Sequence, residues 1–268
     1  MEFIAVAFFK KRGFPKRQSP LKAKPLRNPG QSLDEELERL INDAAILWIA
    51  AIAISFVMVY QEWHKWYTQT PPNPRAALIV AIPVIGVSLI RLFFIVKRTR
   101  RLKMARDGEK AVGQYLSDLQ AKGYRVFHDI LGDGFNVDHI IISDRGIFTV
   151  ETKTYSKPSK GHSEIQFDGE TLLINGQSPY RDPVTQAKAQ ADWSRQVLQE
   201  STGKIFPVKA VIVFPGWYVQ STAKGKRSNL WVLNPKALPA FIEQEPARLQ
   251  QEDVQLAAYH LSRYIRTK

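Results

Sequence analysis

The chain has 268 residues, no cysteine and a formal net charge of +13. This length allows one ordinary domain with attached segments. The lack of cysteine excludes disulfides, thiolate zinc sites and cysteine nucleophiles. Any bound metal must therefore use oxygen or imidazole ligands, which favours Mg²⁺ or Mn²⁺.

The positive charge is distributed unevenly along the chain. The run Lys97–Arg106 holds six basic residues and no acid, whereas residues 107–268 hold 20 basic against 18 acidic residues. Because most of the excess flanks apolar segments, it indicates membrane topology before it indicates nucleic-acid binding. The globular part of the chain is nearly neutral.

Two apolar segments are long enough to cross a bilayer. Ala44–Tyr60 has no charged residue, and Ala76–Val96 has only Arg91. At about 1.5 Å per residue, both segments come close to the roughly 30 Å thickness of the hydrocarbon core. We predict a pair of transmembrane helices over residues 44–96 that contacts membrane lipids. The alternative is a helical hairpin buried inside a soluble protein.

Basic residues on the outer sides of this hairpin predict its orientation. Residues 1–43 are expected to form a basic tail and a short helix capped by Ser32, and residues 97–106 a basic juxtamembrane linker. The loop between the spans has only two basic residues, Lys65 and Arg75. The positive-inside rule then predicts a multi-pass protein of the cell (inner) membrane, with both termini and the globular part in the cytoplasm.

From residue 107 onward, the hydrophobic pattern predicts an α/β (α+β) domain. The expected elements are a helix over 108–122, strands over 124–130, 137–143 and 147–153, a hairpin over 164–174, a helix over 182–199, strands over 208–214 and 230–233, and helices near 235–244 and 251–265. We expect a basic loop at 224–227.

Charged residues stand at the ends of two neighbouring predicted strands. Asp138 opens one strand, while Glu151 and Lys153 close the next and project to the same side. Two carboxylates about 4 Å apart repel by about 4 kcal/mol at an effective dielectric constant near 20, and a cation relieves that repulsion. We predict that Asp138, Glu151 and the Thr152 carbonyl bind Mg²⁺ (or Mn²⁺), with Lys153 beside the attacking water. The alternative is a salt bridge between Glu151 and Lys153, worth about 0–1 kcal/mol if exposed.

The motifs around these residues resemble the nuclease-related domain (NERD) family of the PD-(D/E)xK nuclease superfamily. The resemblance covers roughly residues 107–218 and rests on Gly108-Glu109, Val137-Asp138-His139, Gly146 through Lys153, and Pro183 followed by Gln186-Ala187. It implies a restriction-endonuclease-like mixed sheet flanked by helices, and a metal-dependent endonuclease acting on DNA. Residues 219–268 are then a C-terminal strand and helices that pack on this domain.

Other residues are candidates for the same site. Glu109 either organises a metal or water, or is an acid stabilised in the first turn of a helix. By the resemblance, Gln186 contacts nucleic acid or orients the site; otherwise it lies on a solvated helix face. Some branches of the superfamily have a tyrosine where this chain has Gln190, and His139 is expected in the core or behind the site. Phosphate contacts are predicted for Lys157, Lys160, Arg181, Lys188 and Arg195.

Three functions remain open from the sequence. The first is a membrane-anchored, metal-dependent nuclease that faces the cytoplasm. The second is a non-catalytic module that tethers nucleic acid or a protein to the membrane, as the near-neutral globular part would allow. In the third, the two-helix anchor itself is the functional part and assembles a membrane complex.

Overall fold

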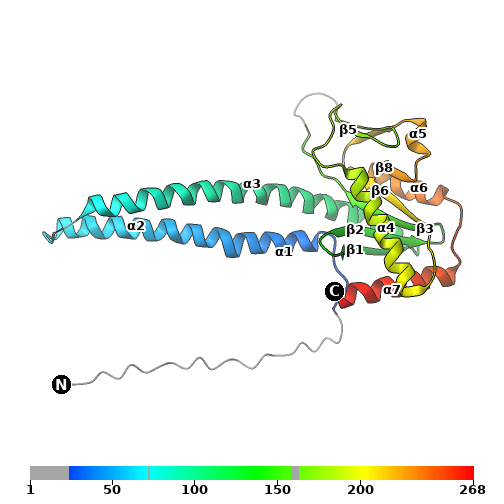
Figure 1. Cartoon of the computed structure of the whole chain (residues 1–268), viewed down its shortest axis with the longest axis horizontal. Coiled ribbons are helices and arrows are strands. Elements are labelled where there is room, and N and C mark those ends of the chain that lie inside the picture. Colours follow the sequence, from blue (N-terminus) through cyan, green and yellow to red (C-terminus); the bar gives the residue numbers. More distant parts are fainter. Residues whose placement is uncertain (1–23, 72, 158–162) are drawn as a thin grey trace, which may run out of the picture.

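A computed structural model describes residues 24–71, 73–157 and 163–268. Figure 1 shows a long helical hairpin that projects from a globular α/β unit. The hairpin contains α1 (Gln31–Arg39), the π-helical turn η1 (Leu40–Ala45), α2 (Ile46–Tyr67) and α3 (Pro74–Ala121).

Helix α3 runs without a break from the tip of the hairpin into the globular unit, over 48 residues. The basic run 97–106, expected to be a linker, is therefore helical, and the helix expected at 108–122 is the end of α3. This run contains no proline or glycine. Two of its six basic residues pair with acids of α1: Arg98 with Glu36, and Arg106 Nη1 with Asp34 Oδ1 at 3.2 Å.

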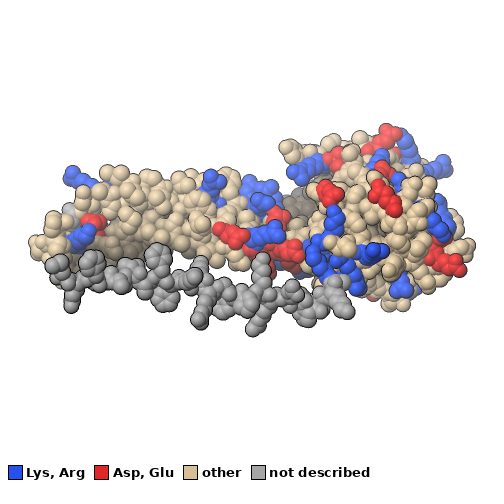
Figure 2. Space-filling view, turned by 60° about the horizontal axis from the view of Figure 1, so that its bottom comes forward, with Lys and Arg blue, Asp and Glu red and all other residues tan. Residues whose placement is uncertain are grey.

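The apolar side chains of the hairpin are largely exposed. Leu47 is 63% exposed, Ile79 71% and Phe93 65%. Figure 2 shows few charged side chains along the hairpin and a cluster of both signs at its base. Both helices are long and apolar enough to cross a membrane. The alternative of a hairpin buried within a soluble protein is wrong, because the described part of the chain leaves these apolar faces uncovered.

The globular unit is built on a five-stranded mixed sheet with the order β1-β2-β3-β6-β8. These strands are β1 (Arg125–Leu131), β2 (Asn136–Ser143), β3 (Gly146–Thr152), β6 (Val208–Val213) and β8 (Leu230–Leu233). The first three pair antiparallel, while β3, β6 and β8 run parallel. Every residue of β3 is buried, as expected for an interior strand covered on both faces.

Helices cover both faces of this sheet, which confirms the predicted mixed sheet flanked by helices. On one face, Val112, Leu116 and Leu119 of α3 pack in a cluster that includes residues of α6 (Leu238–Gln244), which follows the short helix η2 (Pro235–Ala237). The other face is covered by α4 (Pro183–Thr202) and α7 (Gln251–Thr267). Between these layers, the start of β2 and the end of β3 lie side by side at one end of the strands.

A second, three-stranded sheet has the order β5-β4-β7. Its strands are β4 (Glu164–Phe167), β5 (Leu172–Ile174) and β7 (Tyr218–Ser221). The sequence does not predict β7. In the structure its four residues alternate between exposed and half-buried positions, so the strand has no buried apolar face that would mark it in the sequence. The basic loop expected at 224–227 is largely a one-turn helix, α5 (Ala223–Lys226), which is capped by the Thr222 hydroxyl.

Candidate active site

Three of the predicted charged side chains meet where β2 begins and β3 ends. The strands are antiparallel with His139 opposite Val150, so the next step along the register brings Asp138 opposite Glu151. The Asp138 carboxylate accepts a hydrogen bond from the Thr152 backbone N–H at 2.7 Å. Lys153 Nζ donates to Glu151 Oε1 at 2.6 Å. The structure thus brings Asp138, Glu151 and Lys153 together, while their chemical roles stay predictions.

Helix α4 supplies two amides that hold Glu151, which is only 4% exposed. Gln186 Nε2 donates to Glu151 Oε1 at 2.7 Å, and Gln190 Nε2 donates to Oε2 at 2.6 Å. The two glutamines are one helical turn apart and so share a face of α4. Gln186 is therefore not on a solvated helix face. In the sequence, Gln190 is a departure from a tyrosine pattern, and its spacing of four residues from Gln186 is a signal for a shared role that the motif alone does not give.

Lys153 lies between a carboxylate and an amide. Besides Glu151, its ammonium donates to Gln186 Oε1 at 2.8 Å. The ion pair expected as the alternative to a catalytic role is thus present. It differs from a surface pair because the two side chains are only 22% and 5% exposed. It also lies in a cluster that holds further acids.

Glu109 belongs to this cluster although it comes from the helix on the opposite face of the sheet. Burial, together with repulsion from the nearby carboxylates of Asp129 and Glu151, raises its pKa from 4.5 to about 8. Burial likewise raises the pKa of Asp138, with added repulsion from Glu151 and Glu109. The reading of Glu109 as an acid at a helix start is wrong, because α3 begins at Pro74. A cation or a bound proton would relieve this crowding of carboxylates.

Gly108 explains how Glu109 reaches the site. A Cβ atom at position 108 would lie 2.0 Å from the Thr154 hydroxyl oxygen, far inside van der Waals contact. The glycine therefore allows α3 to pass directly against the chain that follows Lys153. This close approach is a packing reason for the Gly108-Glu109 pair.

The oxygen atoms at this edge suit a hard divalent cation. Asp138 and Glu151 contribute carboxylates, and the Thr152 carbonyl leaves the same edge of β3 as the N–H that reaches Asp138. Within the described residues, no group of three or more His, Asp and Glu side chains could hold a metal alone. A cation here would depend on these two carboxylates, the carbonyl and water, as Mg²⁺ often does. Its binding to Glu151 would require Lys153 or an amide donor to turn away.

His139 lies behind the site and is fully buried. Its Nδ1 is 2.9 Å from His128 Nδ1, and its Nε2 is 3.5 Å from the Thr152 hydroxyl. Burial lowers the pKa of both histidines, that of His128 to about 4. The ring is therefore neutral and supports Thr152, in agreement with the expected place of His139 in the core behind the site.

The basic residues predicted to contact phosphates do not form one patch around the carboxylates. Lys157 donates to the Gly216 carbonyl, and Arg181 is exposed just before the Asp182 cap of α4. Lys188 and Arg195 line a cavity beside the beginning of β3, at the opposite end from Glu151. Lys160 lies outside the described residues.

The segment before the hairpin supports the site from behind. Asp129 is 1% exposed, and it accepts hydrogen bonds from Arg27 Nε, the Ser32 backbone N–H and the Ser32 hydroxyl, each at 2.7 Å. Ser32 was expected to cap α1, but Gly30 occupies that position and its own N–H reaches Glu109. We call residues 24–32 the N-terminal strap.

Comparison with known proteins agrees with this geometry. Residues 105–215 match the family model of the nuclease-related domain. An uncharacterised protein of Bacillus anthracis is 40% identical over 83 residues, which are 29% of this chain and 39% of that protein. The chain thus spans well under half the length of this relative. No solved structure matches the chain.

Proposed function

We propose that this chain, whose residues 105–215 match the family model of the nuclease-related domain, is a membrane-anchored, metal-dependent endonuclease that hydrolyses phosphodiester bonds in DNA. The observation that supports this proposal most is the convergence of Glu109, Asp138 and Glu151 around one lysine, Lys153. Such crowding is unfavourable for stability alone, and strongly perturbed acids are typical of functional sites.

Asp138, Glu151 and the Thr152 carbonyl would hold Mg²⁺ or Mn²⁺, which supplies polarisation of the scissile phosphate and a bound water of lowered pKa. Lys153 can leave Glu151 and place its compact charge beside the phosphate oxygens, where negative charge develops. Glu109, with a pKa of about 8, can hold a proton near the reacting groups at neutral pH.

The two glutamines of α4 act as positioning residues in this proposal. Gln190 bridges Glu151 and the Asn136 carbonyl, at 2.6 and 2.9 Å, so it ties the end of β3 to the start of β2. Gln186 contacts both Glu151 and Lys153. It can therefore keep contact with one of them when the other turns toward a ligand.

The apolar hairpin supports a location at the cell membrane, with α2 and the first half of α3 crossing it. The basic run 97–106 favours the cytoplasmic side for both termini and the globular unit. Because α3 continues unbroken from Val96 to Glu109, it would hold the site about 20 Å from the hydrocarbon core at 1.5 Å per residue. Attachment would raise the local concentration of site and substrate, which offsets the modest attraction of a nearly neutral domain for DNA.

A second candidate function is a non-catalytic module that tethers nucleic acid or a protein to the membrane. Residues 107–268 carry 20 basic against 18 acidic residues, and Lys153 uses two of its three N–H donors on Glu151 and Gln186. Both observations fit a domain that binds without cleaving. The third possibility, that the anchor alone is functional, gains nothing from a site built in the globular unit.

A cleavage assay on the full-length protein in detergent or lipid nanodiscs tests the proposal. Supercoiled, linear and branched DNA are incubated with Mg²⁺, Mn²⁺ or a chelator. We expect metal-dependent cleavage that falls at least about 100-fold in Lys153→Ala, the scale for losing one charge-stabilising donor. Lys122→Ala, which removes an exposed lysine far from the site, is the control. Intact DNA under all conditions, together with DNA binding that Glu151→Gln leaves unchanged, would favour the tether.

A further inference from the structure

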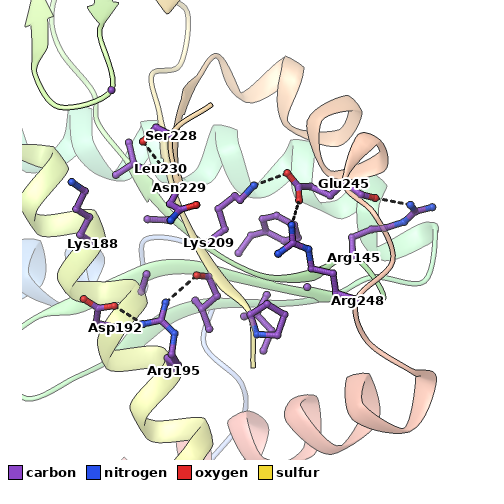
Figure 3. A pocket seen from close by; sticks show the side chains of 18 of the residues that line it. Arg145, Lys188, Asp192, Arg195, Lys209, Ser228, Asn229, Leu230, Glu245 and Arg248 are labelled. Carbon is purple, nitrogen blue, oxygen red and sulfur yellow. Dashed lines mark hydrogen bonds and ion pairs between the residues drawn. The ribbon is translucent and has the colours of Figure 1, made fainter. Parts of the chain in front are cut away.

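A second polar cavity lies at the other end of the main sheet. It has a volume of about 610 Å³ and opens where β3, β6 and β8 begin, whereas the candidate active site lies where β3 ends. Figure 3 shows the cavity between Lys188, Asp192 and Arg195 on α4 and, on the other side of the view, Lys209, Glu245 and Arg248. This volume is in the range of small-molecule sites.

Positive charge exceeds negative charge in the lining. Five basic residues and three acids contribute to it; the basic ones are Arg145, Lys188, Arg195, Lys209 and Arg248. They come from α4, from the beginnings of β3 and β6, and from the chain after α6. Elements far apart in the sequence therefore direct cations toward one space, which is how anion sites are commonly built.

Two of the three acids in the lining pair with these cations, and the third, Glu170, pairs with Lys224 outside the lining. Glu245 pairs with Lys209 at 2.5 Å and with Arg248 at 3.3 Å, while Asp192 pairs with Arg195 at 2.5 Å. Glu245 and Lys209 are 16% and 21% exposed, so their pair lies deep enough to order this wall. In the described part of the chain Lys188 has no acidic partner, and Figure 3 shows its ammonium without an ion pair.

The rest of the lining suits an organic ligand better than a bare ion. Ala191, Ala210 and Leu230 give buried apolar surface, and Ser228 and Asn229 give polar groups at the rim. Sites for small molecules commonly combine an apolar wall with a few polar groups that fix orientation.

The position of the cavity limits where the ligand comes from. Figure 1 places α6, which precedes Glu245 and Arg248 of the lining, on the side of the globular unit away from the hairpin, so we expect lipid headgroups around α2 and α3 not to reach this cavity. A long nucleic acid is disfavoured because Glu170 and Asp192 expose 74% and 71% of their side chains at the rim. A compact anion can approach Lys188, which has no acidic partner among the described residues, without extending over both acids.

We propose that this cavity binds a phosphorylated small molecule of nucleotide size, with its phosphates near Lys188 and Arg195 and its organic part on the apolar wall. The site is separate from the candidate active site, and its occupation does not depend on the nuclease proposal.

Calorimetric titration of the full-length protein in detergent tests this site at constant ionic strength. The probes are ATP, ADP, inorganic phosphate and adenosine. We expect ATP to bind, phosphate to bind more weakly, and adenosine to show no binding. Lys188→Ala and Arg195→Gln should each weaken ATP binding by about tenfold, the scale of one charge-assisted contact. Arg263→Ala on α7 is an exposed-cation control, and Glu151→Gln should leave ATP binding unchanged.

Several results would overturn the proposal. One is the lack of binding by any phosphorylated probe at millimolar concentration, and another is equal affinity in all variants. Loss of ATP binding in Glu151→Gln alone would place the nucleotide at the candidate active site. If ATP fails to bind while duplex DNA binds and is weakened by Lys188→Ala, the cavity belongs to a nucleic-acid surface.

Discussion

Replacing Arg27 by alanine should destabilise the globular unit, although this residue lies before the hairpin and far from the site in sequence. Its Nε donates to Asp129 Oδ2 at 2.7 Å, and the two side chains are 15% and 1% exposed. The substitution leaves a buried carboxylate without its cationic partner. Two donors from Ser32 remain, and the Asn136 amide donates to Asp129 Oδ1 at 3.3 Å.

The expected cost follows from burial and from those remaining donors. Removing one member of a buried ion pair commonly costs about 3–5 kcal/mol. The hydrogen bonds from Ser32 and Asn136 keep the carboxylate partly satisfied, so we expect the lower end of this range, about 3 kcal/mol. The matched control is Arg98→Ala, because Arg98 and Glu36 are 62% and 39% exposed. A pair so exposed contributes about 0–1 kcal/mol.

Urea denaturation of the full-length protein in detergent measures this difference, with the fluorescence of Trp193, Trp217 and Trp231 reporting on the globular unit. We expect a lower free energy of unfolding for Arg27→Ala than for Arg98→Ala. If the two variants unfold within about 0.5 kcal/mol of each other, the contacts of the N-terminal strap do not stabilise the fold, and the reasoning fails.

Three further substitutions test the site. Gly108→Ala should cost about 1–3 kcal/mol, because its Cβ would clash at 2.0 Å; Gly86→Ala, with nothing described within 4 Å, should not change the unfolding of the globular unit. A folded-state pKa of about 8 against 4.5 means that Glu109 binds its proton more tightly in the folded protein. In the presence of a chelator, the free energy of unfolding should therefore fall as pH rises from about 4.5 to 8. An equally steep fall in the Glu109→Gln variant would contradict this prediction. Gln190→Leu should lower both stability, by about 1–3 kcal/mol, and cleavage, whereas the exposed Gln196→Leu on the same helix should not; equal effects would remove the positioning role.

Local patterns predicted most of the main sheet. The strand β8 has the predicted bounds, and β2 and β3 each begin one residue earlier than predicted. Once adjacent antiparallel strands were predicted, the meeting of Asp138 with Glu151 followed from alternation and register. Because Lys153 follows Glu151 by two residues, alternation along the strand also predicted that the two side chains project to the same face.

Contacts between segments distant in sequence could not be predicted in the same way. Nothing in the pattern around Arg27 and Ser32 indicates Asp129 as a partner, because such contacts depend on the packed fold rather than on periodicity. The continuity of α3 was missed because the change from apolar to basic residues at Lys97 indicates a membrane boundary, not the end of a helix. The apolar and the basic part of α3 both form their backbone hydrogen bonds within the helix, so the change in polarity does not interrupt it.

The unbroken α3 connects the apolar hairpin rigidly to the acidic cluster of the globular unit. With no hinge between Val96 and Glu109, reorientation of the apolar half relative to its surroundings carries the acidic cluster with it. A helix longer than the local hydrocarbon thickness accommodates by tilting. A change of about 10° in that tilt would move Glu109 by about 3–4 Å over a 20 Å arm. If the hairpin crosses a bilayer as proposed, the thickness of that bilayer would therefore influence the position of the acidic cluster relative to the lipid surface.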